Sequence, residues 1–199
     1  MANTVEICNL ALAIIGSARI TSISDDVESA RVLNDVFDIV RDSELRANNW
    51  NFAMKRASIA ALTTVPVAEF SYEYQLPSDC LRVVEVGEDT PAVSLTSYRS
   101  SREREWAISG RKIETDLSSP LSIRYVSRVT DTGKFDAMFV TALACRLASV
   151  IANRITDLSD RRSLAMQEYR QAIFEAMRAD AIESPPEALM DNSWIISRL

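Results

Sequence analysis

The segment "FSYEYQL", from Phe70 to Leu76, decides the fold class of this 199-residue chain. Its apolar residues Phe70, Tyr72, Tyr74 and Leu76 alternate with polar ones. An alternation with a period of two predicts a strand that buries one face. The long apolar segments before and after it repeat every three or four residues instead, which predicts helices. We therefore expect helices on both sides of a central β region.

Three more segments extend the predicted β region. "CLRVVEVG" (Cys80 to Gly87) is rich in valine, and "PLSIRYVSRV" (Pro120 to Val129) alternates again. Between them, "EWAISGRKIET" places Ser109-Gly110 between two short runs, which predicts a tight hairpin. Successive strands bracketed by helices are typical of an α+β fold with an antiparallel sheet, and not of a doubly wound one.

Four segments with helical periodicity flank the β region. Gly16 is the predicted C-cap of the first helix, and Ser24 or Asp25 the predicted N-cap of the second. The third and fourth are joined by a short turn, so we expect them to pack as antiparallel neighbours. The four segments are residues 4–15, 24–47, 135–155 and a helix from near 159. Their predicted core positions are Val5, Cys8, Leu12 and Ile15; Ala30, Leu33, Phe37 and Val40; Phe139, Leu143, Leu147 and Val150; and Met166, Tyr169, Ile173 and Met177.

The predicted fold is α+β, mainly an α-helical bundle of about four helices with an inserted antiparallel β domain. The bundle would comprise residues 1–50 and 131–182, and the β domain residues 51–130. Pro185 and Pro186 should end the fourth helix, because proline lacks an amide hydrogen and favours extended neighbours. Residues 183–199 would then form an extended C-terminal arm.

The end of this arm is apolar and carries Trp194, Ile195, Ile196 and Leu199. Tryptophan is a frequent anchor of protein interfaces. We interpret these residues, together with the two prolines behind them, as a partner interface. The alternative is that the arm folds back onto its own bundle.

The composition argues against several classes of protein. The chain has no histidine, which removes the usual triad machinery and the commonest zinc ligand. Its four glycines are scattered, so no phosphate-binding loop is present. A formal net charge of −6 argues against a DNA-binding regulator. The three cysteines lack metal-site spacing and are predicted to be buried thiols.

Three further features of the sequence each have a functional and a structural interpretation. The cluster "SYRSSRERE" could contact phosphates, although a self-compensating loop explains it better. The apolar run "AMFVTALACRLASVIAN" (residues 137–153) contains Arg146 and is predicted to be too short and polar to cross a membrane. A carboxylate-only hydrolase would use side chains that helix capping and surface charge explain better, namely Asp25, Asp26, Glu103, Glu105, Asp157 and Asp160. We expect no enzyme, no catalytic residue, no cofactor and no metal site.

Four stretches together resemble the tail tubular protein A family of short-tailed bacteriophages. They are "NNWNFAMKRASIAAL" (residues 48–62), "FSYEYQLPSDCLRVVEV" (residues 70–86), "FDAMFVTALACRLASVIA" (residues 135–152) and "DNSWIISRL" (residues 191–199). The resemblance extends over nearly the whole chain and rests on the joint pattern, since no single motif is as specific as a metal-ligand signature.

The resemblance implies a structural virion protein. It would be the head-to-tail adaptor: a ring, by family analogy a dodecamer, that joins the portal protein to the tail nozzle protein. DNA would pass through the ring only as cargo, and no membrane would be involved. The protein would lie at the head–tail junction of the virion after assembly in the host bacterial cytoplasm. Alternatives are another head-completion or stopper connector and, less favoured, a carboxylate-based tail hydrolase.

Overall fold

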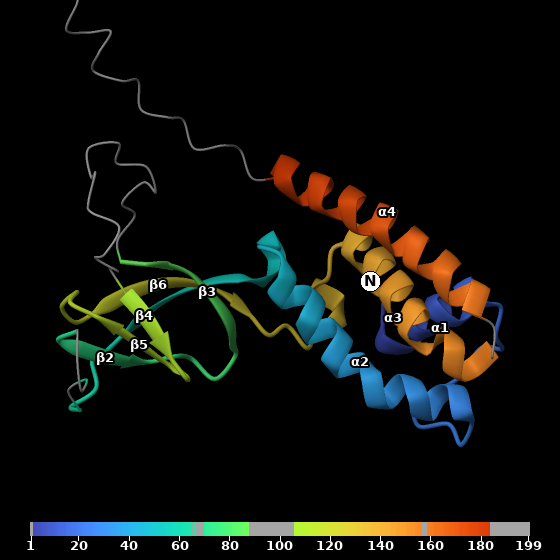
Figure 1. The fold of residues 1–199 in the computed structure, drawn as a ribbon, viewed down its shortest axis with the longest axis horizontal. Helices are drawn as coiled ribbons and strands as arrows, with labels where there is room; N and C mark the ends of the chain where they lie inside the picture. The colour runs from blue at the N-terminus through green and yellow to red at the C-terminus, as the bar shows by residue number, and fades with distance from the viewer. Residues whose placement is uncertain (1, 65, 67–69, 88–105, 157–158, 184–199) are drawn as a thin grey trace, which may run out of the picture.

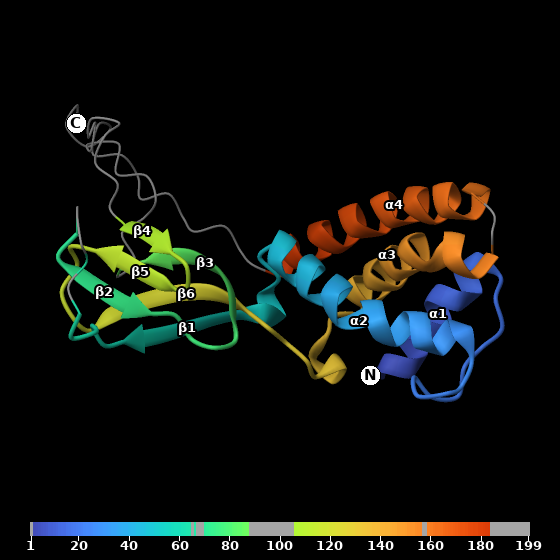
Figure 2. The ribbon, with the colours of Figure 1, turned by 60° about the horizontal axis from the view of Figure 1, so that its bottom comes forward.

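The computed structural model describes residues 2–64, 66, 70–87, 106–156 and 159–183. Four helices lie together at one end of an elongated molecule, and the strands form a separate β region at the other end (Figures 1 and 2). This confirms the predicted α+β fold with four helices. The helices are α1 (Thr4–Ile15), α2 (Glu28–Ala47), α3 (Ala137–Thr156) and α4 (Ser159–Glu183), with short 3₁₀ turns η1 (Asn51–Ala53) and η2 (Thr132–Lys134). The strands are β1 (Met54–Ile59), β2 (Tyr72–Gln75), β3 (Cys80–Val86), β4 (Trp106–Ser109), β5 (Lys112–Thr115) and β6 (Leu121–Ser127).

Helix α3 is the centre of the bundle, and α1, α2 and α4 pack around it. By length and composition alone this 20-residue helix could cross a membrane, so the prediction that it is too short is wrong. Its surroundings give the better account, because Phe139, Leu143 and Leu147 are fully buried among the other helices. We therefore interpret α3 as the core helix of a folded bundle.

Helix α1 has the predicted bounds because both of its ends are capped. Asn3 and Glu6 exchange hydrogen bonds in a capping box, and Gly16 ends the helix in the left-handed conformation at φ 75°. Asn9 interrupts the apolar run because its amide exchanges hydrogen bonds of 2.9 and 2.8 Å with the backbone of Ile20. This pair fixes the loop that follows α1 against the helix.

Helix α2 begins later than predicted and lacks the predicted cap. Its first residue is Glu28, and the N-cap Val27 has no side-chain hydrogen bond to the helix. The Asp25 carboxylate instead accepts from the backbone amides of Thr21 and Ser22, at 2.7 and 2.9 Å. These two bonds lower the pKa of Asp25 below its usual value. Asp25 therefore closes the preceding turn and does not start α2.

The predicted core faces of α3 and α4 need correction at their ends. Val150 is 42% exposed and Met177 is 46% exposed. Among the described side chains of α4, the buried ones are those of Ala165, Ala172 and Ala176. Small residues let two helix backbones approach closely, so the larger apolar side chains of α4 lie beside the contact with α3 or point away from it.

The β region consists of two three-stranded antiparallel sheets, with orders β1-β6-β3 and β2-β5-β4. Their shared core includes Tyr74, Leu76, Ile113 and Ile123. Tyr74 and Leu76 of the opening segment are buried as predicted, but Tyr72 at the start of β2 is 39% exposed. The predicted alternation is therefore correct, with its apolar face covered at only one end of the strand.

The two regions share part of one core. Val126 and Val129, at the end of β6, belong to the buried cluster of the helical bundle. Trp50, at the exit from α2, lies against Phe52 and Phe139, with ring centroids 6.2 and 5.0 Å away. The chain therefore leaves and re-enters the bundle through packed side chains.

The hairpin between β4 and β5 gives a local test of the fold. Gly110 has φ 62°, and nothing lies within 4 Å of the position where a Cβ would be. We expect Gly110→Ala to destabilise the protein by about 1 kcal/mol through backbone strain alone. Gly110→Asn should cost less, because asparagine tolerates this conformation. Denaturant unfolding of both variants checks this, and equal losses would contradict it.

Candidate interface surfaces

The predicted partner-interface residues lie outside the described part of the chain. These are Pro185, Pro186, Trp194, Ile195, Ile196 and Leu199. The cluster "SYRSSRERE" also lies outside it. What the structure places is the helix from which the arm leaves, α4, and the surface around its end.

The end of α4 is joined to the connection between the bundle and the β region. The backbone amide of Asn51 donates to the Asp180 carboxylate at 2.9 Å, and the Asn51 side-chain amide donates to the Asp180 carbonyl at 2.7 Å. Partial burial raises the pKa of Asp180, although the Asn51 bond opposes this. Since 129 residues separate the partners, the pair fixes where the arm begins relative to the β region.

Removing the Asp180 carboxylate should loosen the last turns of α4, although the Asp180 carbonyl can still accept from the Asn51 side chain. We expect Asp180→Ala to lower the free energy of unfolding by about 1 kcal/mol. Amide hydrogen exchange should become faster in residues 176–183 before it changes elsewhere. Asp180→Asn keeps a side-chain oxygen that can accept from the Asn51 amide, so it is the matched control. Unchanged exchange in the alanine variant would show that the pair does not hold the helix end.

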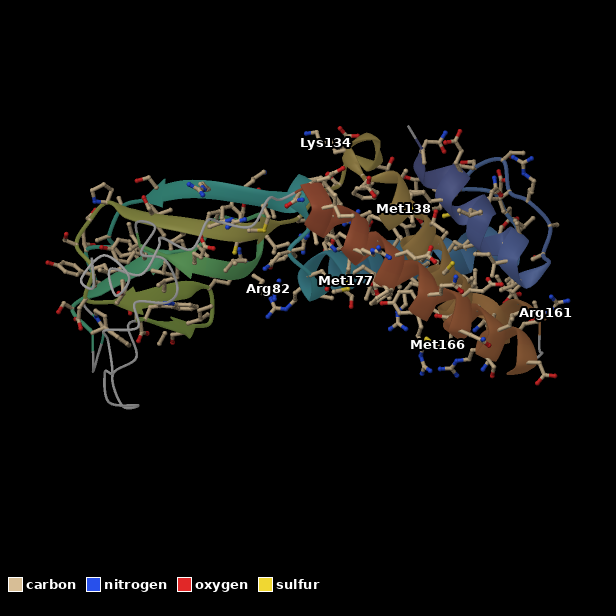
Figure 3. All side chains as sticks on the ribbon, turned by 90° about the horizontal axis from the view of Figure 1, so that it is seen from above. Arg82, Lys134, Met138, Arg161, Met166 and Met177 are labelled. Carbon is tan, nitrogen blue, oxygen red and sulfur yellow. The ribbon has the colours of Figure 1, made fainter. Side chains whose placement is uncertain are left out.

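The outward face of α4 carries large apolar side chains near this end. We call Phe174, Met177 and Ile182 the outer stripe; they are 68%, 46% and 75% exposed. At 100° per residue Phe174 lies opposite Ala165, Ala172 and Ala176, and Met177 and Ile182 lie about 60° and 80° away from it on its two sides. Figure 3 shows Met177 on the part of α4 nearest the β region, far from Arg161 at the other end. The stripe therefore lies next to the start of the arm.

A polar network lies between α4 and the two helices α2 and α3. The Tyr169 hydroxyl donates to one Glu44 carboxylate oxygen at 2.9 Å, and Arg146 Nε lies 3.3 Å from the other. The Arg146 guanidinium also lies 5.2 Å from the centre of the Tyr169 ring. Burial raises the pKa of Glu44, while Tyr169 and Arg146 oppose the rise. The network joins α2, α3 and α4 and so fixes which face of α4 points outward.

Arginines bind backbone carbonyls where α2 meets β3. Arg46 donates to the carbonyl of Leu81, and Arg111 donates to that of Pro77. Arg82 donates to the side-chain oxygen of Asn49. No carboxylate of the described residues pairs with these three side chains. Arg46 and Arg82 hold β3 against the end of α2, whereas Arg111, from the turn between β4 and β5, binds the segment that leads into β3.

The carboxylates considered for hydrolysis do not form an acid–base pair in the described structure. Asp26 pairs with Arg31 on the surface, and Asp160 lies in the first turn of α4. Glu103, Glu105 and Asp157 lie outside the described residues. In the part that is described, no group of three metal-binding side chains occurs, and Cys8, Cys80 and Cys145 are free buried thiols as predicted.

The outer surface of the β1-β6-β3 sheet has an open hollow of about 610 Å³. Arg56, Ser58, Glu85 and Arg124 line it, and Arg124 pairs with Glu85 at 3.0 Å. These side chains offer paired charges and hydroxyls but no arrangement of nucleophile and base.

No family model matches this sequence, and no curated protein matches it.

Sequence reasoning did not find the Glu44 network or the Asn51–Asp180 pair. For Glu44 a signal existed, because it follows Phe37 and Val40 at helical spacing and so falls on the buried stripe of α2. A carboxylate at such a position needs buried partners. For Asn51 and Asp180 no signal existed, since nothing local relates residues so far apart.

Proposed function

We propose that this protein is a structural connector of a short-tailed bacteriophage, the adaptor between the portal and the tail nozzle. The observation that carries the proposal is the joint sequence pattern of residues 48–62, 70–86, 135–152 and 191–199, which resembles the tail tubular protein A family. The helical bundle, built from both ends of the described chain with a β region between them, agrees with the order of elements that this resemblance implies.

The surface of α4 is consistent with assembly into a ring. Large apolar side chains that gather on an exposed surface often mark a site of protein–protein contact. The outer stripe of Phe174, Met177 and Ile182 offers such a surface at the end of the bundle from which the arm leaves. By the same family analogy, the ring would contain twelve copies and DNA would pass through its centre.

The native mass of the purified protein over a concentration series tests self-association directly. We expect large closed species at high concentration, and negative-stain images of them should show rings with a central hole. A monomer at every concentration would contradict self-assembly in the absence of a portal. A small dimer without a hole would contradict the ring itself.

A further inference from the structure

We propose that copies of this protein contact one another head to tail, with the outward face of α4 on one copy lying against the outward face of α2 on the next. The centres of the contact are Phe174 on α4 and Ile39 on α2. The proposal rests on the proposed function only in requiring that the chain self-associates. It adds which two surfaces meet and which charges pair between them.

Each of the two faces exposes one large apolar side chain. On α4, Phe174 is 68% exposed, and Met177 and Ala181 occupy neighbouring positions on the same side of the helix. On α2, Ile39 is 72% exposed, and Val36 beside it is partly buried against the bundle core. Covering both centres in one contact would remove their apolar surface from water.

The two faces cannot meet within one copy, because they point away from the place where α4 and α2 touch. A hydrogen bond of 2.9 Å from the Tyr169 hydroxyl to the Glu44 carboxylate marks that place. At 100° per residue, Phe174 lies about 140° around α4 from Tyr169. Ile39 likewise lies about 140° around α2 from Glu44. In Figures 1 and 2 the two helices lie on opposite sides of α3, so this contact requires two copies.

The charged residues beside the two centres are complementary. Arg170 and Arg178 lie four residues before and after Phe174, within about 40° of it around the helix and about 6 Å from it along the axis. Both arginines are exposed, and neither pairs with another residue of the described chain. Asp35 lies four residues before Ile39 and is likewise exposed without a partner among the described residues. An unpaired guanidinium beside one centre can therefore meet an unpaired carboxylate beside the other.

The other two carboxylates near Ile39 are already paired within one copy. Arg41 donates to Asp38 at 2.7 Å and to Asp42 at 2.8 Å. Arg128 lies 2.7 Å from the second oxygen of Asp42. In the described part of this face, Asp35 is therefore the carboxylate left for a cation of the next copy.

Two different surfaces on one chain make the contact directional. Each copy offers its α4 face to one neighbour and its α2 face to the other, so the contact repeats and closes into a ring where the rotation between copies allows it. A symmetric α4–α4 dimer would instead bring Arg170 and Arg178 of two copies together, which like charges disfavour. Both halves of the contact are present on this chain, and this favours a second copy over an unrelated partner.

Zero-length cross-linking of the full chain tests the pairing. Arg170→Lys and Arg178→Lys each keep the positive charge and add a primary amine, which a carbodiimide joins directly to a carboxylate in contact with it. The chain has only three lysines of its own, Lys55, Lys112 and Lys134, so the background is small. Isotopically heavy and light copies are mixed, so a heavy–light peptide pair identifies a link between copies.

We expect a heavy–light link to Asp35 from one of the two variants. Position 170 is linked if α4 and α2 run in the same direction across the contact, and position 178 if they run in opposite directions. Arg161→Lys is the matched control, because Arg161 lies on the same helix at the end far from the β region (Figure 3). The linking variant should give at least about fivefold more Asp35 link than the control, because docking raises the local concentration of the two groups.

Two further substitutions separate the charges from the apolar centre. Asp35→Asn should abolish the link, because an amide does not react with the carbodiimide. Phe174→Ala, added to the linking variant, should lower the yield about tenfold, since truncating a central aromatic residue of an interface has an effect of this size.

Three results would overturn the proposal. The absence of an Asp35 link from both variants at millimolar protein would mean that the α4 face does not meet α2. An equal yield from the Arg161→Lys control would mean non-specific contact. An unchanged yield with Phe174→Ala would mean that the contact is not centred on that residue.

The outcome is separable from that of the proposed function. Rings without the Asp35 link would leave the connector role standing and remove this contact. An Asp35 link without any ring, alone or on a portal, would keep the contact and contradict the connector role.

Discussion

Replacing Trp50 with alanine is expected to lower the free energy of unfolding by about 4 kcal/mol, the usual cost of emptying a large aromatic site. Trp50 is 1% exposed, and its ring meets Phe139 edge to face at 5.0 Å. Its indole N–H donates to the Glu44 carbonyl at 3.0 Å. For a chain of this length the melting temperature should fall by about 8–16 °C. Thermal and denaturant unfolding measure both quantities.

Trp50→Phe is the matched control for this prediction. It keeps an aromatic ring against Phe139 but removes the indole hydrogen bond and part of the volume, so we expect a loss of about 1–2 kcal/mol. A loss below 1 kcal/mol for Trp50→Ala would show that the packing between α2, α3 and the start of the β region does not support the fold.

Replacing Arg146 with methionine should be the second most damaging change. The Glu44 carboxylate would remain buried with Tyr169 but without its cation. Removing one partner of a fully buried ion pair costs about 3–5 kcal/mol, and we expect about 2 kcal/mol here because the Arg146 side chain is 32% exposed. Adding Glu44→Gln to this variant should restore most of the loss, since no buried charge would remain. Denaturant unfolding of the single and double variants measures the recovery.

The Arg146→Met loss should depend on pH with a definite sign. Burial raises the pKa of Glu44 in the folded protein, so the folded state holds that proton more tightly than the unfolded state. Ionisation of Glu44 therefore weakens the fold as pH rises through the unfolded and then the folded pKa. Without Arg146 the folded pKa rises further. The loss should thus be small near pH 4 and grow toward pH 7, and a loss that shrinks with rising pH would contradict this account.

Local signals predicted much of the fold. The bounds of α1 follow from its apolar period and from Gly16, and the β4–β5 hairpin follows from Ser109-Gly110. Strand β1 was not predicted as a strand. Its sequence "MKRASI" has adjacent charges and no clear alternation, and it is extended because it pairs with β6 over six residues. Such pairing is a property of the whole fold and leaves little trace in a short segment.

The surface of α4 was harder to predict for a related reason. Its large residues suggested a core face that included Met177, whereas the buried positions are Ala165, Ala172 and Ala176. Hydrophobicity scales favour the larger residues, but a close helix contact favours the smaller ones. The exposed side of α4 could therefore be recognised only after its packing against α3 was known.

The most direct test of the connector role is to mix the purified protein with rings of the portal protein encoded in the same genome. Co-sedimentation followed by electron microscopy reports both binding and position. We expect the protein to sediment with the portal and to add a ring of density, open along the central channel, to one end of it. Portal rings that sediment alone and keep their original shape at saturating protein concentration would contradict the connector role.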